Sequence, residues 1–260
     1  MKARLYAIPA SHPSYAAQVM LERKGIPYSR VDLPQWFHRG VLRALRFPGT
    51  TVPAIVLDGR RMQTTKAIAR ALDDVQPEPR LVPLDPDLRA RVEEIETWAD
   101  GDLQQMCRRL IYWALPQHRE AVDSYLEGSR MLMPKATVKP LAPAVIAILH
   151  RVHKAYDPAV RADLATLPGI LDRIDGWIAE GVIGGAEPNV ADLQVATSLA
   201  LLMTHEDLRP FIADRPGGKL AQRLTPGYPG RMPAAFPAEW LALLTAPASS
   251  PAAGDDRHHR

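Results

Sequence analysis

The sequence has a single cysteine, few aromatic residues and no long apolar run. Cys107 alone excludes an intramolecular disulfide framework and is typical of a protein from a reducing compartment. No run approaches the roughly 18 apolar residues of a membrane-spanning helix, and no N-terminal stretch resembles a signal peptide. Basic residues do not gather in a block with interleaved aromatics. These absences predict a cytoplasmic protein with neither a membrane nor a nucleic-acid partner.

The remaining composition is that of an ordinary globular protein. Apolar residues make up 47% and charged residues 23% of the 260 positions, and the formal net charge is only +3. This length accommodates one large domain or two modest ones.

The first part of the chain alternates between strand and helix patterns. An apolar run, Asp58-Gly59 and a short partner indicate a β-hairpin, and Thr64-Thr65 can cap the helix that follows. The expected strands are 3–8, 28–33, 51–57 and 61–63, and the expected helices are 16–24, 35–46 and 66–72. This order, β-α-β-α-β-β-α, predicts a small complete α/β layer.

A proline-rich connector separates this layer from a helical remainder. From residue 88 to Trp113 apolar residues recur at steps of four and three, which predicts one helix of about seven turns. Pro168 is expected to kink or split a later helix, and Asn189-x-x-Asp192 indicates a capping box. The predicted division is an α/β domain at 1–76, a linker at 77–87, an all-helical domain at 88–246 and a disordered tail at 247–260.

The strongest candidate site is Ser11-x-x-Ser14, where the first strand passes into the first helix. Unpaired N–H groups and the helix dipole favour an anion at such a turn. Ser11 can be a reactive hydroxyl or a turn and N-cap residue, and Ser14 can bind a ligand or cap the helix. A proline donates no hydrogen bond to a sheet, so Pro53 indicates a strand start or a special turn. A cis Val52–Pro53 bond would expose the Val52 backbone to a ligand.

Other chemically capable residues have structural explanations that we favour. Cys107 lies beside the apolar stripe and is expected to pack, and Tyr6 is expected to be structural. His150-x-x-His153 has helical spacing but no third ligand nearby, so no metal site is predicted.

Four short patterns together resemble the cytosolic glutathione transferases. They are the stretch from Ser11-x-x-Ser14 to Gly25-Ile26-Pro27-Tyr28, then Thr51-Val52-Pro53-Ala54, Thr65-Lys66-Ala67-Ile68 and Asn189-x-x-Asp192. The resemblance covers nearly the whole chain and implies a thioredoxin-like N-terminal domain followed by an all-α helical bundle. It also implies glutathione as thiol co-substrate, no metal, and a homodimer.

The same resemblance implies roles for individual residues. Ser11 would donate a hydrogen bond to the thiol sulfur and favour the thiolate, so it is the catalytic candidate. The backbone of Val52 and Pro53 would pair with the cysteinyl part of glutathione, and Thr65 would bind the γ-glutamyl carboxylate. Ser14, Thr51 and Thr64 complete the candidate cofactor-binding set.

Thr51 and Thr64 depart from the family pattern. Many members carry lysine or glutamine at the first position and an acidic residue or glutamine at the second, so two anchors of the tripeptide are shortened here. The leading hypothesis is an enzyme that conjugates a low-molecular-weight thiol, glutathione or another, to an electrophilic apolar substrate. The alternative is a non-enzymatic transferase-like binding or scaffolding protein. A glutaredoxin-like reductase is excluded because neither Ser11 nor Ser14 is a cysteine.

Overall fold

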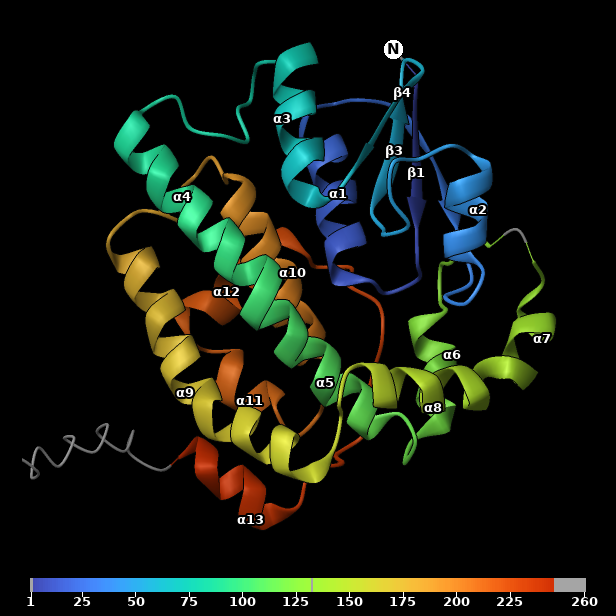
Figure 1. The fold of residues 1–260 in the computed structure, drawn as a ribbon. Helices are drawn as coiled ribbons and strands as arrows, with labels where there is room; N and C mark the ends of the chain where they lie inside the picture. Colours follow the sequence, from blue (N-terminus) through green and yellow to red (C-terminus); the bar gives the residue numbers. More distant parts are fainter. Residues whose placement is uncertain (1, 132, 246–260) are drawn as a thin grey trace, which may run out of the picture.

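A computed structural model describes residues 2–131 and 133–245 of the chain (Figure 1). The tail predicted at 247–260 lies outside the described residues. Within the described part, no helix has the length and apolarity needed to cross a membrane.

The N-terminal layer is a four-stranded mixed sheet with helices on both faces (Figure 1). Its strands are β1 (Ala3–Ala7), β2 (Tyr28–Asp32), β3 (Ala54–Leu57) and β4 (Arg60–Gln63), in the order β2-β1-β3-β4. β1 and β2 are parallel, and the β1–β3 and β3–β4 pairs are antiparallel. Helices α1 (His12–Arg23) and α3 (Thr65–Val75) cover one face, and α2 (His38–Ala44) covers the other. The predicted α/β layer is confirmed.

The hairpin turn forms where the sequence predicted it. Asp58 and Gly59 have φ angles of 45° and 85°, the left-handed conformation that a two-residue hairpin turn requires at both positions. The turn sets the register in which Leu57 lies opposite Arg60.

The rest of the described chain is helical, as predicted. Its helices are α4 (Pro86–Trp98), α5 (Gln104–Ala114), α6 (Val122–Tyr125), α7 (Lys135–Val138), α8 (Ala142–Val152), α9 (Asp157–Ala179), α10 (Val190–Leu202), α11 (Arg209–Ile212), α12 (Pro216–Leu224) and α13 (Ala238–Leu241). The predicted apolar stripe is buried along α4 and α5. These two helices are not one regular seven-turn helix, because a π-helical turn at Ala99–Leu103 joins them.

The sequence predicts a kink or a split at Pro168, and the split does not occur. α9 runs unbroken from Asp157 to Ala179 with Pro168 inside it. A proline in a helix removes one hydrogen bond, here to the carbonyl of Leu164. Leu164, Leu167 and Leu171 are all buried on the inner face of α9, and their packing offsets that loss.

α10 is the centre of the helical part. All of its residues are buried, and it packs against α1, α4 and α12. The predicted capping box is present: Asn189 accepts from the Ala191 and Asp192 N–H groups, and Asp192 accepts from the Asn189 N–H at 2.8 Å. Asp192 is therefore structural, as expected.

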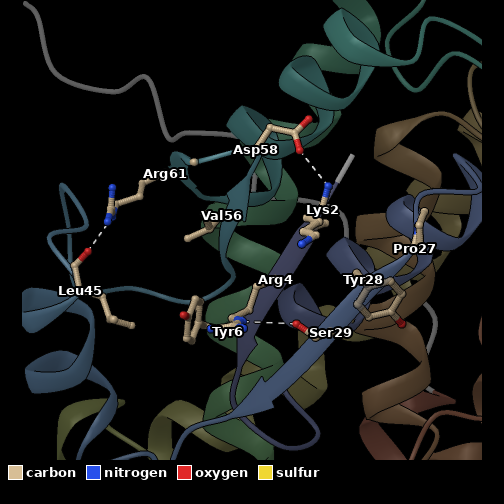
Figure 2. Close-up of a pocket in the computed structure, with 12 residues that line it drawn as sticks. Lys2, Arg4, Tyr6, Pro27, Tyr28, Ser29, Leu45, Val56, Asp58 and Arg61 are labelled. Atoms are coloured by element: carbon tan, nitrogen blue, oxygen red, sulfur yellow. Dashed lines mark hydrogen bonds between the residues drawn. The ribbon is translucent and has the colours of Figure 1, made fainter.

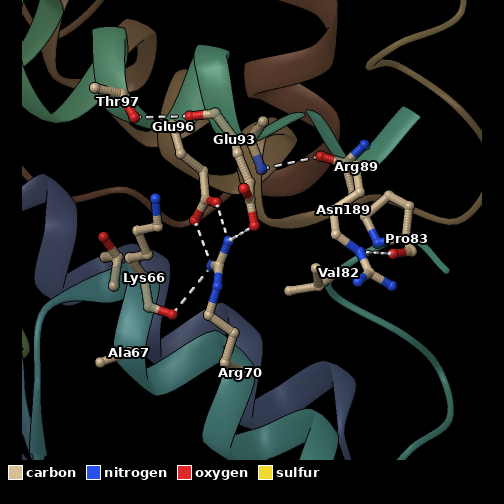
Figure 3. Close-up of polar contacts among 12 residues, drawn as sticks. Lys66, Ala67, Arg70, Val82, Pro83, Arg89, Glu93, Glu96, Thr97 and Asn189 are labelled. Carbon is tan, nitrogen blue, oxygen red and sulfur yellow. Dashed lines mark hydrogen bonds and ion pairs between the residues drawn. The ribbon is translucent and has the colours of Figure 1, made fainter. Parts of the chain in front are cut away.

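An ion-pair cluster joins the two parts of the chain, and a buried ion pair within the N-terminal part anchors the connector. Arg70 on α3 lies between the carboxylates of Glu93 and Glu96 on α4, with contacts of 3.0 and 2.6 Å (Figure 3). Lys24, at the end of α1, donates to Asp73 on α3 at 2.6 Å, and both side chains are almost fully buried. Asp73 also accepts from the N–H of Leu81 in the connector at 2.9 Å.

We expect Asp73→Ala to lower the free energy of unfolding by about 3–5 kcal/mol, because it leaves the buried Lys24 ammonium without its charged partner. Asp74→Ala is the matched control: Asp74 is exposed, so its removal is expected to change stability by less than about 0.5 kcal/mol. Urea denaturation of both variants measures the difference. Equal losses would contradict the assignment of this stabilisation to the buried pair.

Candidate functional site

The candidate residues lie at one edge of the sheet. β1 ends at this edge and leads into α1, while β3 begins there and β4 leads into α3. Tyr6 pairs with Ala54, and Ala54 pairs with Gln63. The turn that holds Ser11, the Val52–Pro53 segment and the start of α3 therefore share one end of the sheet.

Ser11 occupies the N-cap position of α1. Its backbone is extended, with φ −70° and ψ 114°, and its side chain makes no capping hydrogen bond. Most serines at this position accept from a backbone N–H of the first turn. The Ser11 hydroxyl is therefore available to a ligand at the positive end of the helix dipole.

Ser14 does not cap the helix, contrary to one of the two readings of this residue, because α1 already begins at His12. Ser14 lies in the first turn, is only 3% exposed, and its Oγ has no hydrogen-bond partner among the described residues. His12 Nε2 is also buried without a partner in the described part. Burial, reinforced by the nearby Arg108 charge, holds the pKa of His12 well below its usual range, so the imidazole is neutral.

The Val52–Pro53 peptide bond is cis. The Gln63 side chain holds the preceding loop: it accepts from the Gly49 N–H at 2.6 Å and donates to the Thr51 carbonyl at 2.8 Å. The Pro53 carbonyl accepts from the Thr64 N–H at 3.2 Å. The Val52 N–H and C=O make no hydrogen bond with any described residue, so both are free to pair with another main chain.

Thr64 and Thr65 have different surroundings. Thr64 is exposed, has φ 70°, and its hydroxyl caps α3 by accepting from the Ala67 N–H at 3.2 Å, as predicted. Thr65 is only 2% exposed, and its hydroxyl accepts from Gln194 on α10 at 2.9 Å. The Thr65 hydroxyl also lies 3.5 Å from an Asp100 carboxylate oxygen. It therefore faces the helical part, whereas the first N–H groups of α3 remain without intrahelical partners.

A segment from the C-terminal part of the described chain contacts the Ser11 turn. The Tyr228 hydroxyl donates to the Ala10 carbonyl at 2.6 Å, and its ring lies 5.0 Å from that of Tyr15 on α1. Ala10 has φ 54°, an uncommon angle for alanine. Tyr228, Gln194 and Asp100 could not be predicted from the sequence, because no local pattern connects residues so far apart in the chain.

Cys107 and Tyr6 are both buried, as expected. Cys107 is fully buried, and burial raises the pKa of its thiol. Tyr6 is buried against Phe47, with the ring centroids 5.6 Å apart. No group of three metal-ligating side chains occurs in the described part of the chain.

A separate hollow of about 870 Å³ opens on the α2 side of the sheet (Figure 2). Its lining includes Lys2, Arg4, Val56 and Arg61, and it lies toward the hairpin turn. This is the opposite end of the sheet from Ser11, and the hollow contains none of the candidate residues predicted from the sequence.

We expect Tyr228→Phe to loosen the Ser11 turn, because it removes the hydrogen bond to Ala10, worth about 1 kcal/mol. Amide hydrogen exchange over residues 8–14 should become roughly fivefold faster. Tyr125→Phe is the matched control, since the Tyr125 hydroxyl makes a comparable bond to Thr204 at 2.7 Å in the helical part. Unchanged exchange at the turn in Tyr228→Phe, or an equal increase in both variants, would contradict this role.

Comparison with known proteins identifies the N-terminal layer. Residues 5–80 match the glutathione S-transferase N-terminal domain. No curated protein matches the chain in sequence.

Several solved structures share the fold along almost the whole chain. A glutathione S-transferase from Rhodospirillum rubrum F11 is 21% identical, with a TM-score of 0.58 over 93% of this chain and 99% of that one. The glutathione transferase GSTFuA3 from Phanerochaete chrysosporium is 17% identical, with a TM-score of 0.64 over 86% and 96%. The glutathione S-transferase CsGST63524 of Ceriporiopsis subvermispora, solved in complex with glutathione, is 16% identical, with a TM-score of 0.56 over 87% and 96%. At these identities the likeness establishes the fold: this is the architecture of a glutathione S-transferase.

Proposed function

From the glutathione S-transferase fold of this chain, we propose that it is a transferase that joins glutathione, or a related low-molecular-weight thiol, to an electrophilic apolar compound. The observation that carries the proposal is the Ser11 hydroxyl, which occupies the N-cap of α1 without a capping hydrogen bond. Two further features support it: the free backbone of Val52 and the start of α3 lie at the same edge of the sheet.

Ser11 would act by stabilising the thiolate. Its hydroxyl would donate to the sulfur while the thiol proton passes to solvent. A free thiol ionises near pH 8.5, and lowering its pKa by two units requires about 2.7 kcal/mol. A hydrogen bond to a charged group supplies roughly 1.5–3 kcal/mol, and the helix dipole adds about 0.3–1 kcal/mol. These two contributions are together of the required size.

Val52 would hold the cysteinyl residue of the thiol compound. Its unpaired N–H and C=O can form the two hydrogen bonds that an extended peptide offers, in the manner of an added β-strand. This pairing would bring the cysteinyl sulfur toward the Ser11 turn, since both segments lie at the same edge of the sheet.

The start of α3 would receive the γ-glutamyl carboxylate on the N–H groups of Thr65 and Lys66, since the Ala67 N–H already donates to the Thr64 hydroxyl. The Thr65 hydroxyl is already bound by Gln194, so its backbone N–H is the better donor. Thr51 and Thr64, both exposed, contribute only short side chains here. Ser14, buried and without a partner in the described part, can donate to a ligand only from inside the first turn of α1.

The occupied Thr65 hydroxyl favours a second candidate function, a transferase-like binding or scaffolding protein that retains the fold without thiol chemistry. The resemblance also supports a homodimer, which sedimentation analysis of the purified chain tests, and the single cysteine favours a cytoplasmic location.

Calorimetric titration with glutathione, combined with turnover of an activated aryl chloride, tests the proposal. We expect the wild-type protein to bind glutathione with a micromolar to low-millimolar Kd. Ser11→Ala should retain binding but lose at least about tenfold in kcat/KM, because the thiolate loses a charge-assisted hydrogen bond.

Ser29→Ala provides the control, because Ser29 is an exposed residue on β2 whose hydroxyl accepts only from Arg4. It should leave binding and turnover unchanged. Absence of binding at several millimolar glutathione would reject this thiol and favour another thiol or the binding-protein function. Full activity in Ser11→Ala would reject the role of Ser11.

A further inference from the structure

One stretch of the helical part is strongly basic. Residues 128–156 contain five lysine or arginine residues and no aspartate or glutamate, although acidic residues are almost as frequent as basic ones in the whole chain. We call this stretch the basic segment. It contains α7 and α8, which lie at the periphery of the molecule beyond α5 (Figure 1).

The basic segment also exposes a row of large apolar side chains. Ile148 is 59% exposed and Val152 is 60% exposed, and both lie on α8 at a spacing of four residues. Leu141, just before α8, is 46% exposed, and Tyr156, just after it, is 49% exposed. At helical spacing, Leu141, Ile148 and Val152 fall on one face. This face is an apolar stripe, whereas single exposed apolar residues would need no explanation.

The opposite face of α8 is fixed to the rest of the protein. Ile146 is buried, and the Gln105 side chain on α5 donates to the His153 carbonyl at 3.2 Å. The His153 ring stacks on Tyr112 of α5 with 4.9 Å between the ring centroids. These contacts hold α8 with its apolar stripe directed away from α5.

Most of the cations around the stripe are unpaired. Lys139 forms an ion pair with Asp123 at 2.8 Å. Arg151 and Lys154 are exposed and form no ion pair with any other described residue, whereas Arg130 lies away from the stripe, beside Asp32 of β2. An apolar row on one helix, flanked by free cations, is the pattern of a helix that lies at an anionic interface.

We propose that the basic segment docks on the surface of an anionic lipid bilayer, with Ile148 and Val152 inserted at the boundary of the headgroups and Arg151 and Lys154 on the lipid phosphates. The stripe is an exposed face of one helix, and a lipid surface can accept it without a complementary groove. A second copy of this chain would bring the same cations face to face and be repelled. This inference replaces the expectation that the protein has no membrane partner, which rested on the lack of a spanning segment.

The binding would be peripheral and reversible. α8 is 11 residues long and the stripe has few large side chains, so the apolar contribution is small. Attraction between the cations and the anionic headgroups supplies much of the affinity and weakens as salt screens it. The inference does not depend on the proposed thiol chemistry.

Co-sedimentation of the full chain with vesicles tests the proposal. We expect binding to vesicles of phosphatidylcholine mixed with phosphatidylglycerol at low salt, and little binding to phosphatidylcholine alone. Arg151→Ala combined with Lys154→Ala should weaken binding on the order of thirtyfold, from the loss of two cations near the surface. Ile148→Glu should abolish binding, because it places a carboxylate in the stripe.

Leu84→Glu is the matched control, since Leu84 is 61% exposed but lies in the connector, outside the basic segment. It should bind vesicles as the wild type does, and circular dichroism should show that every variant is folded. Failure to bind anionic vesicles at low salt would overturn the proposal and favour an acidic protein partner. Equal binding to neutral vesicles, or equal losses in Leu84→Glu and Ile148→Glu, would also overturn it.

Discussion

The packing of α1 on α10 is the constraint on which the candidate site depends. α10 is buried along its whole length and contacts helices from both parts of the chain. Because it lies against α1, the sheet and the helical bundle share one hydrophobic core. This shared core fixes the N-terminus of α1, where Ser11 and Ser14 lie, against the helices that approach it from the second part. The candidate site is therefore a product of both parts.

Two hydrogen bonds from the helical part also position the candidate site. Gln194 on α10 reaches Thr65 at the start of α3, and Tyr228 reaches the Ala10 carbonyl beside Ser11. Each contact comes from the helical part and ends on a residue next to a helix N-terminus. The N-termini of α1 and α3, which could each receive an anion, are thus both contacted by residues of the helical part. The Ser11 hydroxyl and the Val52 backbone remain available between them.

The sequence predicted the elements that local chemistry controls. Asp58-Gly59 predicted the hairpin, and Asn189-x-x-Asp192 predicted the capping box. It failed where packing overrides local preference, as at Pro168 inside α9 and at the π-helical turn. Contacts between distant residues, such as Tyr228 with Ala10, leave no local pattern, so no reading of a single sequence could have found them. The roles assigned to Ser11 and Thr65 remain predictions.

We propose that the N-terminus of α1 stabilises a thiolate, and the pKa of the bound thiol measures this effect directly. Ultraviolet titration of glutathione in complex with the wild-type protein follows the thiolate absorbance as the pH is raised. We predict a thiol pKa about two units below the value near 8.5 of the free group. A bound thiol that titrates like the free one would contradict it, because Ser11 and the helix dipole would then contribute nothing to ionisation.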